Sequence, residues 1–164
     1  MDKINEMTER LEQRMYGLVP YNISPIQQGI QFGHAVVEYG LEYGHKSDDP
    51  YLQWARNDKT FIILNGGTTN KNEDRYGTLN IAQSELHAMG VQLSTFNEPD
   101  LGDQLTAVVF LVDERVWDRE KYPEYVEMYL DHVLEEPNYY FNLFGDDTDK
   151  ILGMREFLSK YKLA

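Results

Sequence analysis

The sequence predicts an α/β protein, a three-layer αβα domain with a mixed sheet of about four strands and extra helices at its C-terminal end. Segment 59–65 is a continuous apolar run typical of a buried strand, and a long helical pattern separates it from a strand expected at 14–20. Strand, helix and strand in succession indicate a parallel pair joined by a right-handed crossover. Segment 91–96 alternates and segment 105–112 is strongly β-prone, which predicts a hairpin with a long loop.

The composition fits one globular domain that covers residues 1–164. The chain is 41% hydrophobic and 26% charged, and no apolar run approaches the roughly 20 residues that span a membrane. The first ten residues are polar and lack the apolar stretch of a signal peptide, so we expect a cytoplasmic protein without a membrane partner. The absence of Cys excludes disulfides, thiol catalysis and Cys-bound zinc, and neither a cofactor nor a metal is expected.

The net charge of −13 argues against a broad nucleic-acid surface, because phosphate binding would require a local cluster of cations. Residues 113–149 are rich in Asp and Glu and contain only Arg115, Arg119 and Lys121 as Lys or Arg cations. Two interpretations of this acidic segment stay open: a solvated charged surface, or a site for a protein partner that it engages by mimicking nucleic acid.

Helical patterns account for most of the remaining chain. Residues 2–13 are expected to form a short amphipathic helix, and Pro50 begins a second short helical piece. A third helix is expected to be capped by Asn80 and ended by Gly90. Two apolar stripes at helical spacing predict helices in the C-terminal part: Tyr122, Val126, Tyr129 and Val133, followed by Ile151, Met154, Leu158 and Tyr161.

The helix that begins at Ser24 and Pro25 has the pattern of a binding-site wall. Ser24 is a good N-cap, and Pro25 suits the first helical position. Two stripes follow: an apolar one of Ile26, Ile30, Gly33, Val37 and Leu41, and beside it a polar one of Gln27, Gln31, His34 and Glu38. The polar stripe predicts either one wall of a pocket or a solvated helix face. Free N–H groups of the first turn favour an anion.

Gly66 and Gly67 follow directly after the strand expected at 59–65. A Gly-Gly pair at the C-terminal end of a strand can approach a phosphate closely, and it can equally form an ordinary turn. The segment has neither the Lys-Ser/Thr of a P-loop nor the spacing of a dinucleotide-binding loop.

Two motifs in this frame resemble a known family. They are S-P-x-Q-Q-x-x-Q-x-x-H-A at 24–35 and E-P-D-L-G-x-x-L-T-A at 98–107. Their order in a β-α-β-α-β-β frame is similar to that of the type 2 peptidyl-tRNA hydrolases and their smaller phage and bacterial relatives. The resemblance covers a core at 14–112, and the helical extension at 113–164 looks like the C-terminal tails of phage-encoded relatives.

The resemblance implies hydrolysis of the ester that links a peptide to the 3′ end of tRNA. His34 would activate or orient a water, and Asp100 would fix the imidazole tautomer or act on the water itself. The expected substrate-binding residues are Gln27, Gln31 and Thr106 from the motifs, together with Gly66 and Gly67.

The chain departs from the family at positions that carry charge. Pro25 and Gln27 stand where typical members have lysines, and Asp103 and Gln104 stand where they have Arg and Thr. Three functions therefore stay open: an esterase acting on peptidyl-tRNA or a smaller (amino)acyl nucleotide, an inactive protein of the same fold that binds a small nucleotide, and an acidic protein-interaction module. Homo-oligomer formation is also left open.

Overall fold

The computed structural model describes residues 10–70, 75–124 and 139–164, and it contains one four-stranded mixed sheet. The strands are β1 (Gln13–Pro20), β2 (Phe61–Gly67), β3 (Ser94–Glu98) and β4 (Gln104–Asp113), in the order β2-β1-β4-β3. The first two strands, β1 and β2, are parallel, while β4 runs antiparallel to both β1 and β3. This confirms the mixed sheet and the hairpin that the sequence predicts.

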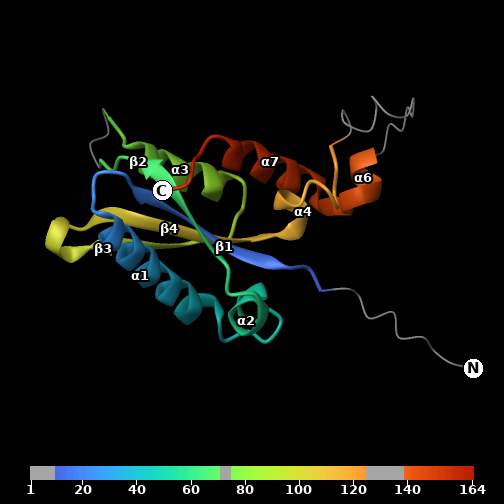
Figure 1. Cartoon of the computed structure of the whole chain (residues 1–164), viewed down its shortest axis with the longest axis horizontal. Helices are drawn as coiled ribbons and strands as arrows, with labels where there is room; N and C mark the ends of the chain where they lie inside the picture. Colours follow the sequence, from blue (N-terminus) through green and yellow to red (C-terminus); the bar gives the residue numbers. More distant parts are fainter. Residues whose placement is uncertain (1–9, 71–74, 125–138) are drawn as a thin grey trace, which may run out of the picture.

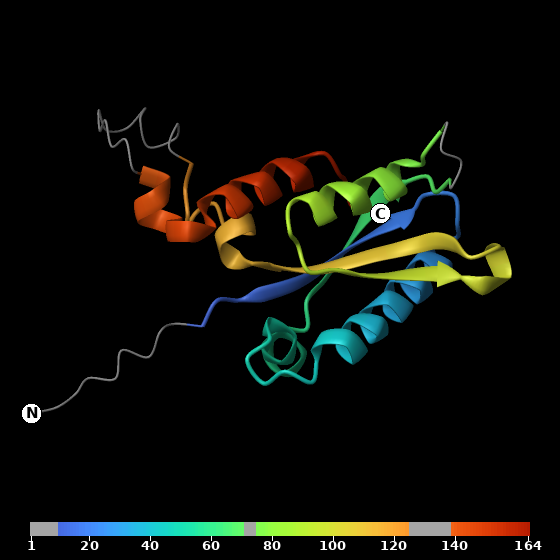
Figure 2. The ribbon, with the colours of Figure 1, turned by 180° about the vertical axis from the view of Figure 1, so that it is seen from behind.

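Helices cover both faces of the sheet, which gives the three-layer arrangement seen in Figures 1 and 2. One face carries α1 (Pro25–Tyr43), α2 (Pro50–Gln53) and the π-helical turn Trp54–Asp58. The other carries α3 (Thr78–Ala88), α4 (Glu114–Trp117) and α7 (Thr148–Ser159), with the short α6 (Tyr139–Phe144) beyond the end of the sheet. No helix within the described ranges has the length and apolar character needed to cross a bilayer.

Alternate residues of the central strands point to opposite faces of the sheet and pack against the helices there. Ala107 and Val109 of β4 face α1, whereas Val108 and Phe110 face α3 and α7. Gly17 of β1 has no side chain where the ring of Phe32 lies against the strand, so α1 can approach the sheet closely.

The C-terminal helices belong to the same core as the sheet. Ile151, Met154 and Phe157 of α7 are buried with the sheet residues, and Leu158 is partly buried beside them. After α7 the chain pairs with β2, where the N–H of Asn65 donates to the carbonyl of Lys162 at 2.8 Å. The stripe that predicts α7 is therefore confirmed, although Tyr161 lies just beyond the end of the helix.

The predicted cap of α3 is wrong. The helix begins at Thr78, whose hydroxyl donates to the carbonyl of Gly66 at 2.7 Å and accepts the N–H of Thr68. Asn80 lies in the first turn, and its Oδ1 accepts the N–H of Asn70 instead of capping the helix. Thr78 thus fixes the helix start to the preceding strand, a contact that local sequence does not reveal. The predicted end at Gly90 is confirmed, with φ 70°.

Two strand boundaries also differ from the prediction. The strand expected at 91–96 begins at Ser94, because the N–H of Val91 still donates to Leu86 in the closing turn of α3. The strand expected at 59–65 begins at Phe61 and continues through Gly67, since the π-helical turn occupies the chain up to Asp58. Most of the helix expected at 2–13 and of the stripe expected at 122–133 lies outside the described residues. The described end of the first is not helical, because Gln13 already belongs to β1 and pairs with Asp113 of β4.

The apolar stripe of α1 faces solvent, not the sheet. Leu41 is 72% exposed, and Ile26 and Val37 are similarly open. The helix instead buries Phe32, Ala35 and Tyr39, which recur at i, i+3 and i+7 on the opposite side. An aromatic pair with a small residue between them packs against the flat sheet, and this pattern is less conspicuous in the sequence than the aliphatic one.

Candidate functional site

A cavity of about 380 Å³ lies between the N-terminal end of α1 and the β3–β4 hairpin. Figures 1 and 2 both show this end of α1 beside the turn of the hairpin. The lining combines Ile23 with residues from the two predicted motifs: Ser24, Gln27, Gln31, Glu98, Asp100 and Leu101. The fold thus brings two segments about 70 residues apart in sequence to the same cavity.

Gln31 is the most firmly held polar side chain of the cavity wall. It is only 4% exposed, and its Nε2–H donates to Glu98 Oε2 at 2.9 Å. Its Oε1 accepts the hydroxyl proton of Thr106, which is 1% exposed, at 2.6 Å. Because both ends of the amide are bonded, its orientation is fixed, and the buried polar groups satisfy one another.

The turn after β3 is stabilised by two hydrogen bonds from its backbone N–H groups to Glu98. The N–H of Asp103 donates to the carbonyl of Glu98 at 3.0 Å, and the N–H of Asp100 donates to Glu98 Oε1 at 3.4 Å. Gly102 and Asp103 both have positive φ, a conformation that Gly and Asp adopt more readily than most residues. Asp100 is therefore presented, exposed, at the cavity by a constrained turn.

His34 lies beyond Gln31 on α1 and does not line the cavity. Its exposed ring packs edge-on against Phe96 of β3, with the ring centroids 4.4 Å apart. Of the two residues expected to be catalytic, only Asp100 borders the cavity, whereas His34 lies farther along α1 and packs against Phe96 of β3. A common role of the two in catalysis stays a prediction.

Gly66 and Gly67 lie at the end of β2, where they contact α3, and they do not line the cavity. A side chain at Gly66 would meet Leu79 at 2.9 Å, and one at Gly67 would overlap the hydroxyl of Thr78. Gly67 also has φ 83°, which favours glycine. Close packing at the start of α3 explains both glycines without a ligand.

The charge of the cavity differs from what a phosphate-binding site requires. Glu98 and Asp100 contribute carboxylates, and the lining contains neither Lys nor Arg. Ser24 Oγ already accepts the N–H of Gln27 at the start of α1. Such a lining offers hydrogen-bond acceptors and suits hydroxyl or amino groups better than phosphate. Within the described ranges, no group of three or more His, Asp or Glu could hold a metal ion.

Glu98 is a charged residue of the cavity lining that was not among the predicted site residues. It stands in the second motif two positions before Asp100, and its carboxylate both fixes Gln31 and borders the cavity. An E-x-D pattern shortly after the predicted strand places Glu98 close to Asp100 in the sequence. It did not single out Glu98, because only the fold shows that its side chain turns back toward α1.

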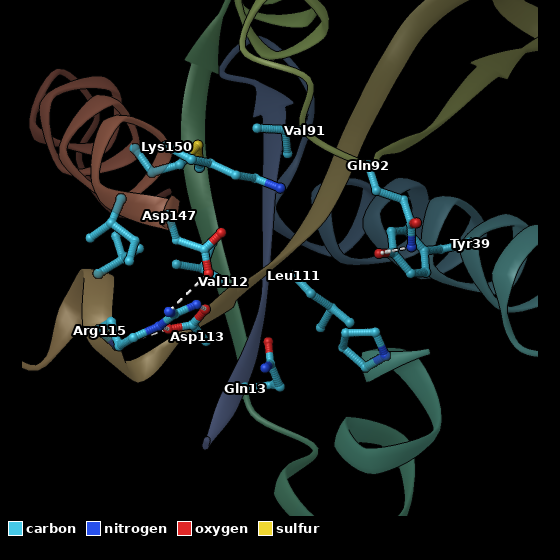
Figure 3. Close-up of a pocket in the computed structure, with 14 residues that line it drawn as sticks. Gln13, Tyr39, Val91, Gln92, Leu111, Val112, Asp113, Arg115, Asp147 and Lys150 are labelled. Atoms are coloured by element: carbon cyan, nitrogen blue, oxygen red, sulfur yellow. Dashed lines mark hydrogen bonds and ion pairs between the residues drawn. The ribbon is translucent and has the colours of Figure 1, made fainter. Parts of the chain in front are cut away.

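A second cavity of about 220 Å³ lies between the end of β4, α1 and α7 (Figure 3). Here Arg115 is held by Asp113 at 2.9 Å and by Asp147 at 3.0 Å, and these carboxylates raise the pKa of its guanidinium. On the other side, Gln92 Nε2 donates to the hydroxyl of Tyr39 at 2.8 Å. Arg115, Asp113 and Asp147 are paired with one another at this cavity, which favours a structural role for these three groups.

The fold and the cavity define a mixed α/β domain with an acidic, hydrogen-bonding pocket. Compared with known proteins, the chain matches no family model and no curated protein. The resemblance to type 2 peptidyl-tRNA hydrolases therefore depends on the two motifs and their order alone.

Proposed function

We propose that the chain is a nucleoside- or nucleotide-binding protein whose α1–hairpin cavity holds the ribose of its ligand. The observation that carries this proposal is the fixed amide of Gln31, bonded between Thr106 and Glu98 on the wall of the cavity. A polar group held in one orientation selects a ligand at low entropic cost, because little of its freedom remains to be lost on binding.

The lining favours the sugar over the phosphate. Carboxylates accept hydrogen bonds from ribose hydroxyls, and Glu98 and Asp100 supply two of them without a neighbouring cation in the lining. The volume of about 380 Å³ lies within the usual range of small-ligand sites. A nucleoside should therefore bind more tightly than its mono- or triphosphate.

The test is thermal unfolding with adenosine, AMP and ATP. We expect adenosine to raise the unfolding midpoint most, and Glu98→Gln to weaken adenosine binding about tenfold or more, in line with the loss of a charged hydrogen-bond acceptor. Glu156→Gln is the matched control, since Glu156 is exposed on α7 and the charge change is the same. No shift with adenosine, or equal shifts in both variants, would contradict the proposal.

A second candidate is hydrolysis of an ester at the 3′ end of an acylated nucleotide or tRNA. Asp100 at the cavity and His34 farther along α1, beside Phe96 of β3, support it, because both could contact a substrate longer than a nucleoside. Single-turnover cleavage of a peptidyl-tRNA analogue, compared between the wild type and His34→Ala, tests it. Unchanged cleavage in the variant would exclude His34 as the water-activating group.

A further inference from the structure

A separate cavity of about 280 Å³ lies on the opposite face of the sheet from α1. Trp117 of α4 and Arg155 of α7 line it, together with apolar residues of β2 such as Ile62 and Leu64. Arg119 also borders it, and its guanidinium is paired with Glu124 at 2.6 Å at the protein surface. None of the predicted site residues belongs to this cavity.

Arg155 is a buried cation that forms no ion pair with a carboxylate among the described residues. The residue is 5% exposed, and its Nη2 donates to the carbonyl oxygens of Arg115 at 2.7 Å and Tyr122 at 2.8 Å. Within the part of the chain that the structure describes, its Nε and Nη1 have no hydrogen-bond partner. Burial lowers the pKa of its guanidinium, and the nearby Arg119 lowers it further. A buried charge in this state requires a counterion or further acceptors.

The unpaired donors are concentrated in one place. Among the described residues, the buried side-chain nitrogen and oxygen atoms without a partner are Arg14 Nε, Trp117 Nε1, Arg155 Nε and Arg155 Nη1. All four are N–H donors, and the Arg14 guanidinium lies 3.4 Å from the centre of the Trp117 ring. Buried polar groups are normally paired, so a cluster of donors alone indicates that an acceptor is to be supplied from outside.

We propose that this cavity binds an oxyanion, a carboxylate or phosphate group of a small molecule, with Arg155 as its counterion and Trp117 Nε1–H as a second donor. The apolar part of the lining suits a non-polar ligand body. The donors are covered by protein atoms, so binding includes a rotation of Trp117 or Arg155 toward the cavity. Although the chain as a whole is acidic, Arg155 borders this cavity and Arg14 stacks on its Trp117, while the charge of Arg119 is balanced by Glu124.

The test uses the full chain, with inorganic phosphate and benzoate as probes at constant ionic strength maintained with NaCl. We expect at least one probe to raise the unfolding midpoint with increasing concentration, and Arg155→Gln to lose most of that shift. Arg56→Gln is the matched control, because Arg56 is exposed in the π-helical turn on the other face. A response to phosphate alone identifies a phosphorylated ligand, and a response to benzoate alone identifies a carboxylate.

Trp117→Phe keeps the proposal testable if Arg155→Gln does not fold. This variant keeps an aromatic ring beneath Arg14 and removes the indole N–H together with the five-membered ring, so it should fold and bind the active probe at least threefold more weakly. Failure of both probes to shift the wild type would overturn the proposal. Equal shifts in Trp117→Phe and Arg56→Gln would also overturn it, because the ions would then act elsewhere.

Discussion

Gln31 of α1 and Thr106 of β4 are 75 residues apart in the sequence and joined by a hydrogen bond of 2.6 Å. The bond connects the helix that carries the first motif to the strand that ends the second. Glu98 completes the arrangement at 2.9 Å from the same amide. The position of the cavity relative to the sheet depends on this buried polar contact.

Replacement of Thr106 by Val should destabilise the protein and weaken ligand binding together. Val has nearly the same shape as Thr, but it cannot donate a hydrogen bond to Gln31 Oε1. Leaving this buried oxygen without a donor should lower the free energy of unfolding by about 1–3 kcal/mol. Urea unfolding measures the loss. Thr95→Val is the control, because Thr95 lies on β3 and is only partly buried, and it should change the free energy of unfolding by less than about 0.5 kcal/mol. Equal losses in the two variants would contradict the role of Thr106.

The ion pair of Arg10 with Asp58 should make stability depend on pH at the acid end. Arg10 donates to Asp58 at 2.7 Å and holds the pKa of that carboxyl below its ordinary value of 3.8. The ion pair therefore contributes fully to the free energy of unfolding above about pH 4. This contribution is lost as the pH falls through the lowered pKa of Asp58 in the folded protein.

Asp58→Asn should remove this dependence and lower the free energy of unfolding at pH 7 by about 1 kcal/mol, as expected for a carboxylate that also accepts the N–H of Gln13. Urea unfolding at pH 7 and at pH 3 measures both effects. If the loss between these two pH values were as large in Asp58→Asn as in the wild type, other carboxyl groups would be responsible.

The helical extension should be part of the folding unit. Phe157 of α7 is 2% exposed and its ring packs on Phe110 of β4 with centroids 6.1 Å apart, so Phe157→Ala should cost about 3–5 kcal/mol. Phe141→Ala in α6 removes the same atoms from a residue that is 60% exposed and should cost far less. Thermal unfolding compares the two, and similar losses would show that α7 does not stabilise the sheet.

Substitutions on the buried side of α1 should change stability much more than substitutions on its exposed side. Ala35 is fully buried against the sheet, so Ala35→Leu should overpack the core and cost about 1–3 kcal/mol. Leu41→Ser, on the exposed stripe, should change stability by no more than about 0.5 kcal/mol. A large loss from Leu41→Ser would mean that the stripe is covered in solution, as it would be in a homo-oligomer, and analytical ultracentrifugation would then detect the assembly.

The sequence predicts those parts of the fold that depend on local pattern. The strands, the crossover helix from Ser24 and the end of α3 at Gly90 follow from periodicity, capping and glycine. The sequence misleads where tertiary contact outweighs local pattern. The bonds of Thr78 move the start of α3, and packing of Phe32 against Gly17 orients α1 with its aliphatic stripe outward.

In the candidate site, too, local motifs predict some residues, whereas tertiary contacts determine others. Gln27, Gln31 and Asp100 from the two motifs line one cavity, and their roles in binding or catalysis stay predictions. The motifs do not reveal Glu98 as the partner of Gln31, because that contact joins a helix to a distant strand end. The cluster around Arg155 has no motif at all, since its donors come from three separate parts of the chain.

Chemical-shift mapping of the isotope-labelled protein with adenosine tests the central claim most directly. If the α1–hairpin cavity binds the ribose, the largest shifts will be those of the side-chain amide of Gln31 and the backbone N–H groups of Asp100 and Leu101, with small changes around Arg155. Absence of shifts at saturating adenosine, or shifts centred outside the cavity, would contradict the claim.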